Sequence, residues 1–217
     1  GYRPVTDPDP IRITEAASLI NNAERPLIMS GHGVTISHSF DQIRELAEKA
    51  QIPVLTTLLG RSTFPDDHIL SVGMPGMHGL AYASLAIDEA DLVIGLGMRF
   101  DDRITGKVSA FAQNAKIIHV DIDPAEIDKN VQTDVAIVGD LKKVLLREKQ
   151  QPNQIQRRRP RPKGFGDRVG KARGSPCLAE VVRPPRRLQG RSAAGRGWSG
   201  AAAQGCWPCF RTICLGP

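Results

Sequence analysis

The sequence predicts an α/β fold with a doubly wound, mostly parallel sheet, followed by a disordered basic tail. Between residues 11 and 146, short apolar runs alternate with longer amphipathic runs, as expected when strands and helices follow one another along the chain. The apolar runs, such as DLVIGLG, contain few polar residues, so we expect strands that are buried on both faces. Short connections between the runs favour βαβ units and hence a parallel sheet.

Three long helices are predicted from the spacing of apolar residues. Residues 11–23 place apolar side chains at helical intervals, and the Ala- and Leu-rich residues 79–89 do so again. Residues 39–50 show the clearest amphipathic pattern, with Ser37 or Ser39 as the N-cap. Each of these helices can cover one face of the sheet.

The remaining elements complete the alternation. A short helix over residues 124–129 begins with Pro124, where the missing N–H costs nothing. Asp140 is placed to cap a closing helix, and residues 60–79 are predicted to form a glycine-rich loop region. The five predicted strands are residues 27–30, 52–57, 91–97, 116–122 and 134–138.

Charge divides the chain into two parts. Residues 1–146 hold 13 Lys and Arg against 20 Asp and Glu, a net charge of −7, whereas residues 147–217 hold 16 against 3, a net charge of +13. We therefore expect a linker over residues 1–10, a domain over 11–146 and a basic low-complexity tail over 147–217. No apolar run approaches the roughly 20 residues that span a bilayer, so no membrane partner is expected.

The tail is predicted to be disordered. After Leu146 the periodicity stops, and a stretch rich in Arg, Pro, Gly, Ala and Gln cannot bury enough apolar surface to offset ordering. Its composition is that of GC-rich coding DNA translated in a wrong frame, so we interpret it as a frameshift product. All four cysteines lie here, and we interpret the CWPC motif at Cys206–Cys209 as chance and the basic run at 157–161 as poor support for nucleic-acid binding.

Glycines and acidic residues follow each predicted strand. Open parallel sheets bind ligands at the carboxyl ends of their strands, so this pattern favours a nucleotide-like ligand. A bare GxG after a strand is, alternatively, only a turn. Asp121 and Asp123 are predicted to share one face of a strand end, with Ile122 pointing into the core. From spacing alone they serve equally well to bind ribose or adenine and to cap the helix ahead of Pro124.

Arginines four residues apart follow the predicted strand 91–97. Arg99 and Arg103 suit bidentate capture of a phosphate or carboxylate, and a solvated charge cluster is the alternative. His78 precedes a helix, where it can stack on a ring or play a structural part. No spacing of His, Asp or Glu predicts a metal site, and no Ser-His-Asp arrangement is evident.

Several long motifs carry a family resemblance over residues 1 to about 146. They are GYRP, RPLIMSGHGV, IPVLTTLLG, FPDDHILSVGMPGMHG, ADLVIGLGMRFDDRITGK, AKIIHVDIDPAEIDKN and VAIVGDLKKVL. In this order they resemble the central domain of the acetohydroxyacid synthase (acetolactate synthase) large subunit, a Rossmann-like middle domain of thiamine diphosphate enzymes. The chain has Gly31-His32-Gly33 where the family commonly carries a run of glycines.

The resemblance implies a parent enzyme that uses thiamine diphosphate and Mg²⁺ to join pyruvate to a second 2-ketoacid, either pyruvate or 2-ketobutyrate, in branched-chain amino-acid biosynthesis. It implies FAD with a mainly structural role in this domain, a homo-oligomer with a small regulatory subunit, and a cytoplasmic or plastid location. The thiamine diphosphate and metal sites belong to other domains. We therefore expect this piece to be inactive alone.

The resemblance also implies a set of site residues. Arg103, with Asp102 beside it, corresponds to the arginine that recognises the acceptor ketoacid carboxylate. The implied flavin contacts are Gly31, Gly33, Thr57, Leu58, Met77, His78, Gly97, Met98, Arg99, Asp101, Arg103, Asp121, Ile122, Asp123, Glu126, Gly139 and Asp140. Two other functions are kept open: a non-catalytic nucleotide-binding module of a related thiamine diphosphate enzyme, and a nucleic-acid-binding protein acting through its tail.

Overall fold

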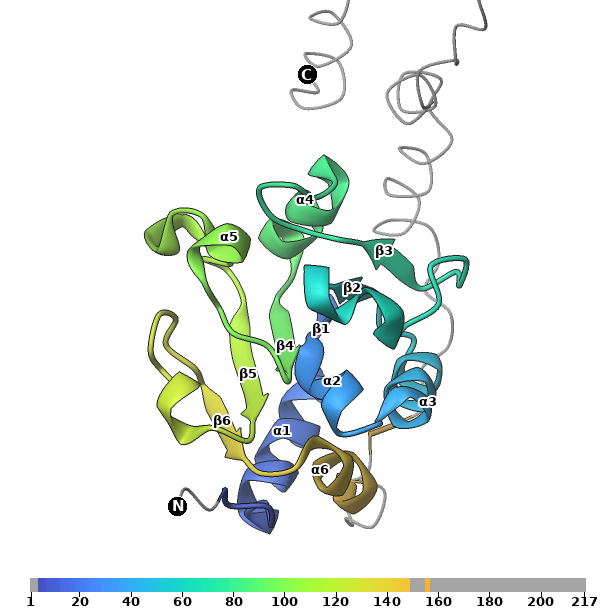
Figure 1. The fold of residues 1–217 in the computed structure, drawn as a ribbon, viewed down its shortest axis with the longest axis vertical. Helices are drawn as coiled ribbons and strands as arrows, with labels where there is room; N and C mark the ends of the chain where they lie inside the picture. Colours follow the sequence, from blue (N-terminus) through green and yellow to red (C-terminus); the bar gives the residue numbers. More distant parts are fainter. Residues whose placement is uncertain (1–3, 149–154, 157–217) are drawn as a thin grey trace, which may run out of the picture. The chain divides into compact units, whose positions relative to one another are not determined.

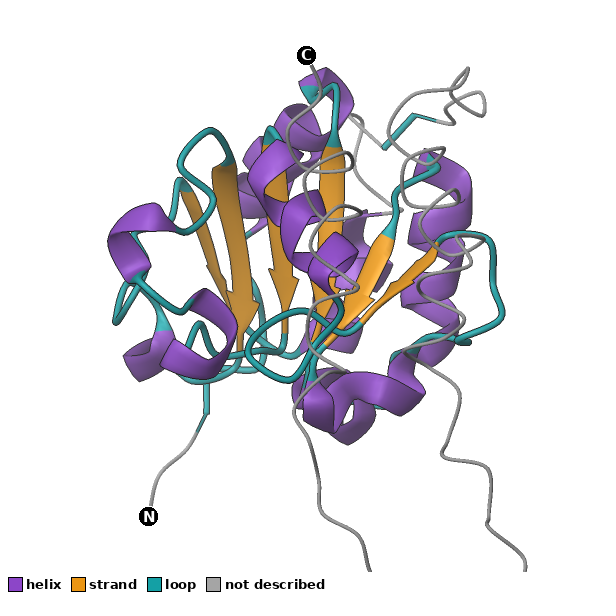
Figure 2. Ribbon diagram, turned by 90° about the horizontal axis from the view of Figure 1, so that it is seen from above, coloured by secondary structure: helices purple, strands orange, loops and turns teal. Residues whose placement is uncertain are grey.

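A six-stranded, all-parallel sheet forms the centre of the domain in a computed structural model that describes residues 4–148 and 155–156 (Figure 1). The strand order is β3-β2-β1-β4-β5-β6, and the arrows of neighbouring strands point the same way (Figure 2). The strands are β1 (Pro26–Ser30), β2 (Val54–Thr56), β3 (Ser71–Gly73), β4 (Leu92–Leu96), β5 (Lys116–Asp121) and β6 (Val135–Val138).

Helices connect the strands and lie on both faces of the sheet (Figure 2). The α-helices are α1 (Pro10–Asn22), α2 (His32–Ile36), α3 (Phe40–Ala50), α4 (Ala81–Glu89), α5 (Asp102–Thr105) and α6 (Leu141–Glu148). Three 3₁₀ helices add η1 (Leu58–Thr63), η2 (Val108–Ala110) and η3 (Pro124–Glu126). None of the helices described in residues 4–148 is long and apolar enough to cross a membrane.

The core has two layers because consecutive strand residues point to opposite faces. On one face Ile28, Ile94 and Ile118 pack against α1, α3 and α6. On the other, Met29 and Val93 pack against α4 and the aromatic residues that follow β4. Burial of β1 and β4 on both sides explains their unbroken apolar sequences.

Helix termini follow local chemistry. The Asp9 carboxylate accepts a hydrogen bond from the Ile11 N–H at 2.9 Å, and Pro10 occupies the first turn of α1. Asp140 accepts from the Lys143 N–H at 3.0 Å, which confirms its predicted role as the cap of α6. Ser39 does begin α3, but its hydroxyl makes no capping bond to that helix.

The structure corrects several predicted elements. The predicted sheet has five strands, but Ser71–Gly73, within the region predicted as a loop, pairs with β2 as a sixth strand. The chain after β1 turns at once into α2, and the chain after β4 forms α5, neither of which was predicted. The helix predicted over 124–129 is only the single turn η3.

Contacts continue past residue 146. Helix α6 runs to Glu148, and the Ile155 side chain is 2% exposed within the core that α1 and α6 share. The Ile155 N–H donates to Glu148 Oε1 at 2.8 Å, and the Gln156 N–H donates to Asn21 Oδ1 at 2.8 Å. The rest of the predicted disordered tail, with its cysteines, lies outside the described residues.

The segment before α1 packs on α6. Arg147 donates to the Pro8 carbonyl at 2.9 Å and to Asp7 Oδ1 at 3.0 Å, and Lys143 also pairs with Asp7. The Asp140 N–H donates to the Thr6 carbonyl at 3.0 Å. The described part of the predicted linker is therefore held against the domain.

Candidate functional site

Gly31, Gly33 and Gly97 lie close together at the switch point of the sheet. Here β2 and β3 have been added on one side of β1, and the chain continues with β4 on the other side. A Cβ on Gly31 would lie 2.3 Å from the Gly97 carbonyl oxygen, and one on Gly33 would lie 2.7 Å from the Gly97 Cα. Gly97 itself has a φ of +57°, which favours glycine. Sheets of this topology leave a crevice for ligands at this switch point between β1 and β4.

The amide groups of these glycines are used within the domain. The Gly31 N–H donates to the Leu96 carbonyl at 3.0 Å, and the Gly33 N–H donates to the Gly97 carbonyl at 2.9 Å. The glycines therefore allow two backbone segments to touch. That role supports the turn interpretation of the GxG pattern, and direct contact of these glycines with a ligand stays a prediction.

Hydroxyl groups line the ends of β1 and β2. The Ser30 and Thr63 hydroxyls are 2.6 Å apart, and Thr63 donates to the Gly60 carbonyl. Thr56 Oγ1 is buried with no hydrogen-bond partner among the described residues, and Thr57 is buried beside it. The neighbouring Leu58 is 70% exposed, so a polar and an apolar group adjoin at this edge.

The chain after β4 presents its charged groups outward. Met98 and Phe100 are buried, whereas Arg99 is exposed and its guanidinium lies 3.7 Å from the Asp101 carboxylate. Asp101 Oδ1 is buried without a partner among the described residues. Arg103 extends from α5 as an exposed side chain, as a phosphate or carboxylate ligand requires.

The end of β5 carries the predicted pair of carboxylates. Asp121 Oδ1 accepts from the Asp123 N–H at 2.9 Å, and Asp123 Oδ1 accepts from the Ala125 N–H at 3.0 Å. Asp123 is thus the cap of η3, and the second oxygen of each carboxylate makes no hydrogen bond to a described residue. Ile122, predicted to point into the core, is 40% exposed, because the strand ends at Asp121 and the chain turns outward.

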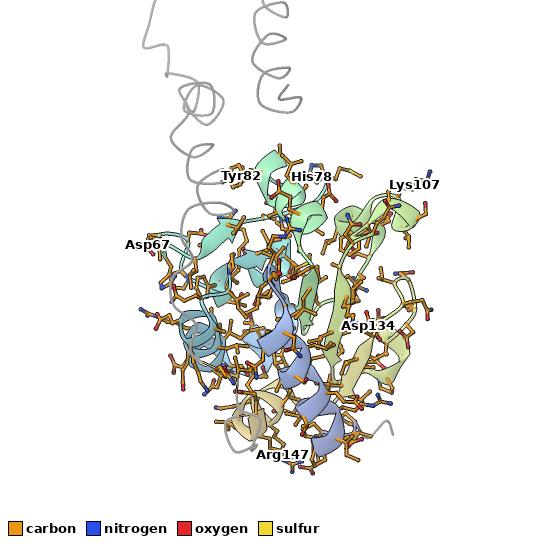
Figure 3. All side chains as sticks on the ribbon, turned by 180° about the vertical axis from the view of Figure 1, so that it is seen from behind. Asp67, His78, Tyr82, Lys107, Asp134 and Arg147 are labelled. Atoms are coloured by element: carbon orange, nitrogen blue, oxygen red, sulfur yellow. The ribbon has the colours of Figure 1, made fainter. Side chains whose placement is uncertain are left out.

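A cleft lies between α4 and the α5–η2 segment. Its volume is about 400 Å³, and it is lined by Met77, Asp88, Arg103 and Lys107 among others. The β3–α4 loop lies directly against α5. The Met77 N–H donates to the Arg103 carbonyl at 3.0 Å, and Gly76 lies so close to that same oxygen that a Cβ there would clash with it. His78 and Lys107 lie at the same end of the domain (Figure 3).

The last three predicted contact residues, Glu126, Gly139 and Asp140, already make contacts within the domain. Glu126 pairs with Lys129 at 2.9 Å, and Gly139 lies against Pro8. Asp140 caps α6 through one oxygen. All three nevertheless follow β5 or β6, so they share the carboxyl edge of the sheet with the other predicted residues.

These residues fit an extended dinucleotide such as FAD. Five strand spacings of about 4.8 Å put about 24 Å between β3 and β6, so one ligand must be long to reach both ends of this edge. The Thr56 and Asp101 oxygens, buried without a partner among the described residues, can hydrogen-bond to such a ligand; the arginines suit a diphosphate, and the exposed Met77 suits a ring system. Within the described residues no three His, Cys, Asp or Glu side chains gather to hold a metal ion.

Sequence reasoning missed His119 and Asn130. His119 lies in β5, is 1% exposed, and donates from Nε2 to the Met98 carbonyl at 2.7 Å. Asn130 donates from Nδ2 to the Phe100 carbonyl at 2.9 Å. The available signal for His119 was a polar residue between Ile118 and Val120 in the strand sequence KIIHVDI, since a buried imidazole needs a partner.

Burial lowers the pKa of His119 below 6.5, against the raising effects of the Met98 carbonyl and nearby carboxylates. The unfolded chain then binds a proton just below pH 6.5 that the folded domain does not. The neutral His119 ring therefore contributes its full share to the free energy of unfolding above pH 6.5. As the pH falls below 6.5, the free energy of unfolding decreases by at most about 1.4 kcal/mol per pH unit. Urea unfolding between pH 7.5 and 5.5 should therefore show a shallower pH dependence for His119→Gln than for the unmodified chain; equal slopes would contradict it.

The strand order, with its switch point between β1 and β4, defines a Rossmann-like α/β domain. Residues 13–147 match the family model described as the thiamine pyrophosphate enzyme, central domain, and the chain belongs to that family.

Known relatives give the comparison more detail. The chain is 53% identical over 145 residues to the acetolactate synthase of Mycobacterium bovis, covering 67% of this chain and 24% of the relative. The acetolactate synthase large subunit of Corynebacterium glutamicum is 50% identical over 147 residues, 68% of this chain and 24% of its own length. That of Arthrospira platensis, named acetolactate synthase, is 50% identical over 148 residues, 67% and 26% respectively. The chain thus spans about a quarter of these relatives.

Proposed function

We propose that residues 11–146 are the FAD-binding central domain of an acetolactate synthase large subunit. The observation that carries this proposal is that every predicted contact stands at or after the carboxyl end of a parallel strand, across the sheet from Met77 after β3 to Asp140 after β6. Identity of 50–53% to acetolactate synthases supports the choice of family member. FAD would be held here mainly as a structural group.

The parent reaction joins pyruvate to a second 2-ketoacid, and thiamine diphosphate with Mg²⁺ supplies that chemistry when bound by other domains. In this domain Arg103 would bind the carboxylate of the acceptor, pyruvate or 2-ketobutyrate, because a planar guanidinium forms two parallel hydrogen bonds with a planar anion. The Met77 N–H to Arg103 carbonyl bond fixes the backbone from which that side chain extends. Asp102 begins α5 beside it.

A second copy of the chain and a small regulatory subunit are the proposed partners of the parent.

FAD affinity tests the proposal through the carboxylates after β5. In the double variant Asp121→Asn/Asp123→Asn, each side chain keeps one oxygen for the backbone bonds described above but loses its charge and second acceptor oxygen. We expect the Kd for FAD to rise about 10- to 100-fold, the scale of one or two charge-assisted hydrogen bonds. Titration of flavin fluorescence in the purified chain measures it.

The matched control is Asp66→Asn/Asp67→Asn, which removes the same charge from an exposed loop before β3. Its Kd should equal that of the unmodified chain. Equal affinities for the two double variants would remove the proposed adenosine contacts, and no saturable binding by the unmodified chain would count against FAD itself.

A further inference from the structure

The 98–103 segment, Met98 to Arg103, carries four of the proposed ligand contacts, and three other segments hydrogen-bond to its backbone. The Met98 carbonyl accepts from His119 on β5, and the Phe100 carbonyl accepts from Asn130 beyond η3. The Arg103 carbonyl accepts from the Met77 N–H in the β3–α4 loop. The carbonyls of Met98, Phe100 and Arg103 each accept a hydrogen bond from another part of the domain, while Arg99 is exposed.

His119 contacts this segment in two ways at once. Its ring meets the Phe100 ring edge-on, with centroids 4.9 Å apart and planes at 77°, while Nε2 donates to Met98. Space for the Phe100 ring exists because residue 95 is glycine: a Cβ there would lie 2.8 Å from Phe100 Cζ. Phe100 also packs against Phe111, with ring centroids 5.9 Å apart.

The chemistry of this contact requires a neutral imidazole. Met98 offers only a carbonyl, so Nε2 must carry the hydrogen, and Nδ1 is left buried with no partner among the described residues. A second proton on Nδ1 would bury a charge with no hydrogen-bond acceptor among the described residues, a cost that outweighs the attraction of Asp121, Asp128 and Glu126. The ring is thus one fixed tautomer between Met98 and Phe100.

We propose that His119 is a positioning residue for the ligand site: it sets the backbone of the 98–103 segment, so that Arg99 and Asp101 meet a bound nucleotide in one orientation, without itself touching the ligand. The proposal rests on FAD binding at this edge. Asn130 shares this role: His119 donates to the Met98 carbonyl, and Asn130 donates to the Phe100 carbonyl two residues further on.

Conservative replacement separates positioning from simple packing. His119→Gln keeps an N–H donor near the position of Nε2, whereas His119→Leu fills the space without a donor. In the full chain we expect His119→Leu to weaken FAD binding about tenfold, the scale of one lost hydrogen bond, and His119→Gln to recover most of that loss. Asn130→Asp, which removes the second donor with little change in shape, should weaken FAD binding to a similar extent.

Amide hydrogen exchange in the absence of FAD gives an independent measurement. Exchange at Ile104 and Thr105, whose N–H groups donate to the Asp101 carbonyl at 3.0 and 2.9 Å, should quicken in His119→Leu and return in His119→Gln, while exchange in β1 stays unchanged. If FAD fails to bind the unmodified chain, the proposed ligand is wrong, and this exchange result still decides whether His119 positions the segment. Unchanged exchange and affinity in His119→Leu would overturn the proposal. Equal losses in the Leu and Gln variants, or a loss spread evenly over β1, would overturn it as well.

Discussion

Replacing Gly97 with Ala is expected to destabilise the domain by about 3–5 kcal/mol, a large share of the stability of an ordinary domain. The added Cβ would lie 2.7 Å from the Gly33 Cα and 3.0 Å from the Gly33 carbonyl carbon, which are backbone atoms. Gly33 cannot retreat without losing its N–H bond to the Gly97 carbonyl. The positive φ adds about 1–2 kcal/mol of strain for any L-residue. Urea unfolding monitored by circular dichroism measures the loss.

Gly106→Ala is the control for backbone strain alone. Gly106 has a φ of +58°, close to that of Gly97, but a Cβ there would meet nothing within 4 Å. We expect it to cost about 1–3 kcal/mol, the range for one strained residue. If Gly97→Ala cost no more than Gly106→Ala, the close approach of the Gly33 and Gly97 backbones would be absent in solution.

Replacing Ile155 with Asp is expected to cost about 4 kcal/mol or more. Removing a buried isoleucine side chain costs about 2–5 kcal/mol by itself, and the new carboxylate would be buried close to Glu148, whose Oε1 accepts from the residue 155 N–H. The result would show that the folded core reaches beyond residue 147, where the match to the family model ends. Thermal unfolding of the full chain gives the measurement.

Two control variants accompany Ile155→Asp. Ile155→Leu conserves volume and should cost less than about 1.5 kcal/mol, and Gln156→Asp changes an exposed neighbour and should have little effect. If Ile155→Asp proved as stable as Gln156→Asp, residue 155 would not belong to the core.

Local sequence was sufficient to predict much of the fold and to point to one edge of the sheet as the candidate site. Consecutive residues form the apolar runs of β1, β4 and β5 and the amphipathic pattern of α3. Whether each segment is a strand or a helix could therefore be predicted without knowing which segments pack against it. The glycines and acidic residues after those strands predicted a ligand edge for the same reason. In a parallel sheet, the ends of all the strands reach that edge together.

Tertiary structure decided what depends on contacts between distant segments. The three residues of β3 carry no strand pattern of their own, and they form a strand because β2 offers an unpaired edge. Ile122 follows the turn of the chain after β5 rather than the alternation of the strand. The touching of Gly33 and Gly97, and the bond from His119 to Met98, join residues that the sheet brings together. Local sequence predicted five of the six strands and where their polar ends lie. Packing across the sheet added the sixth strand and determined how those ends meet, because a residue's partners there are set by strand pairing and not by its neighbours in the chain.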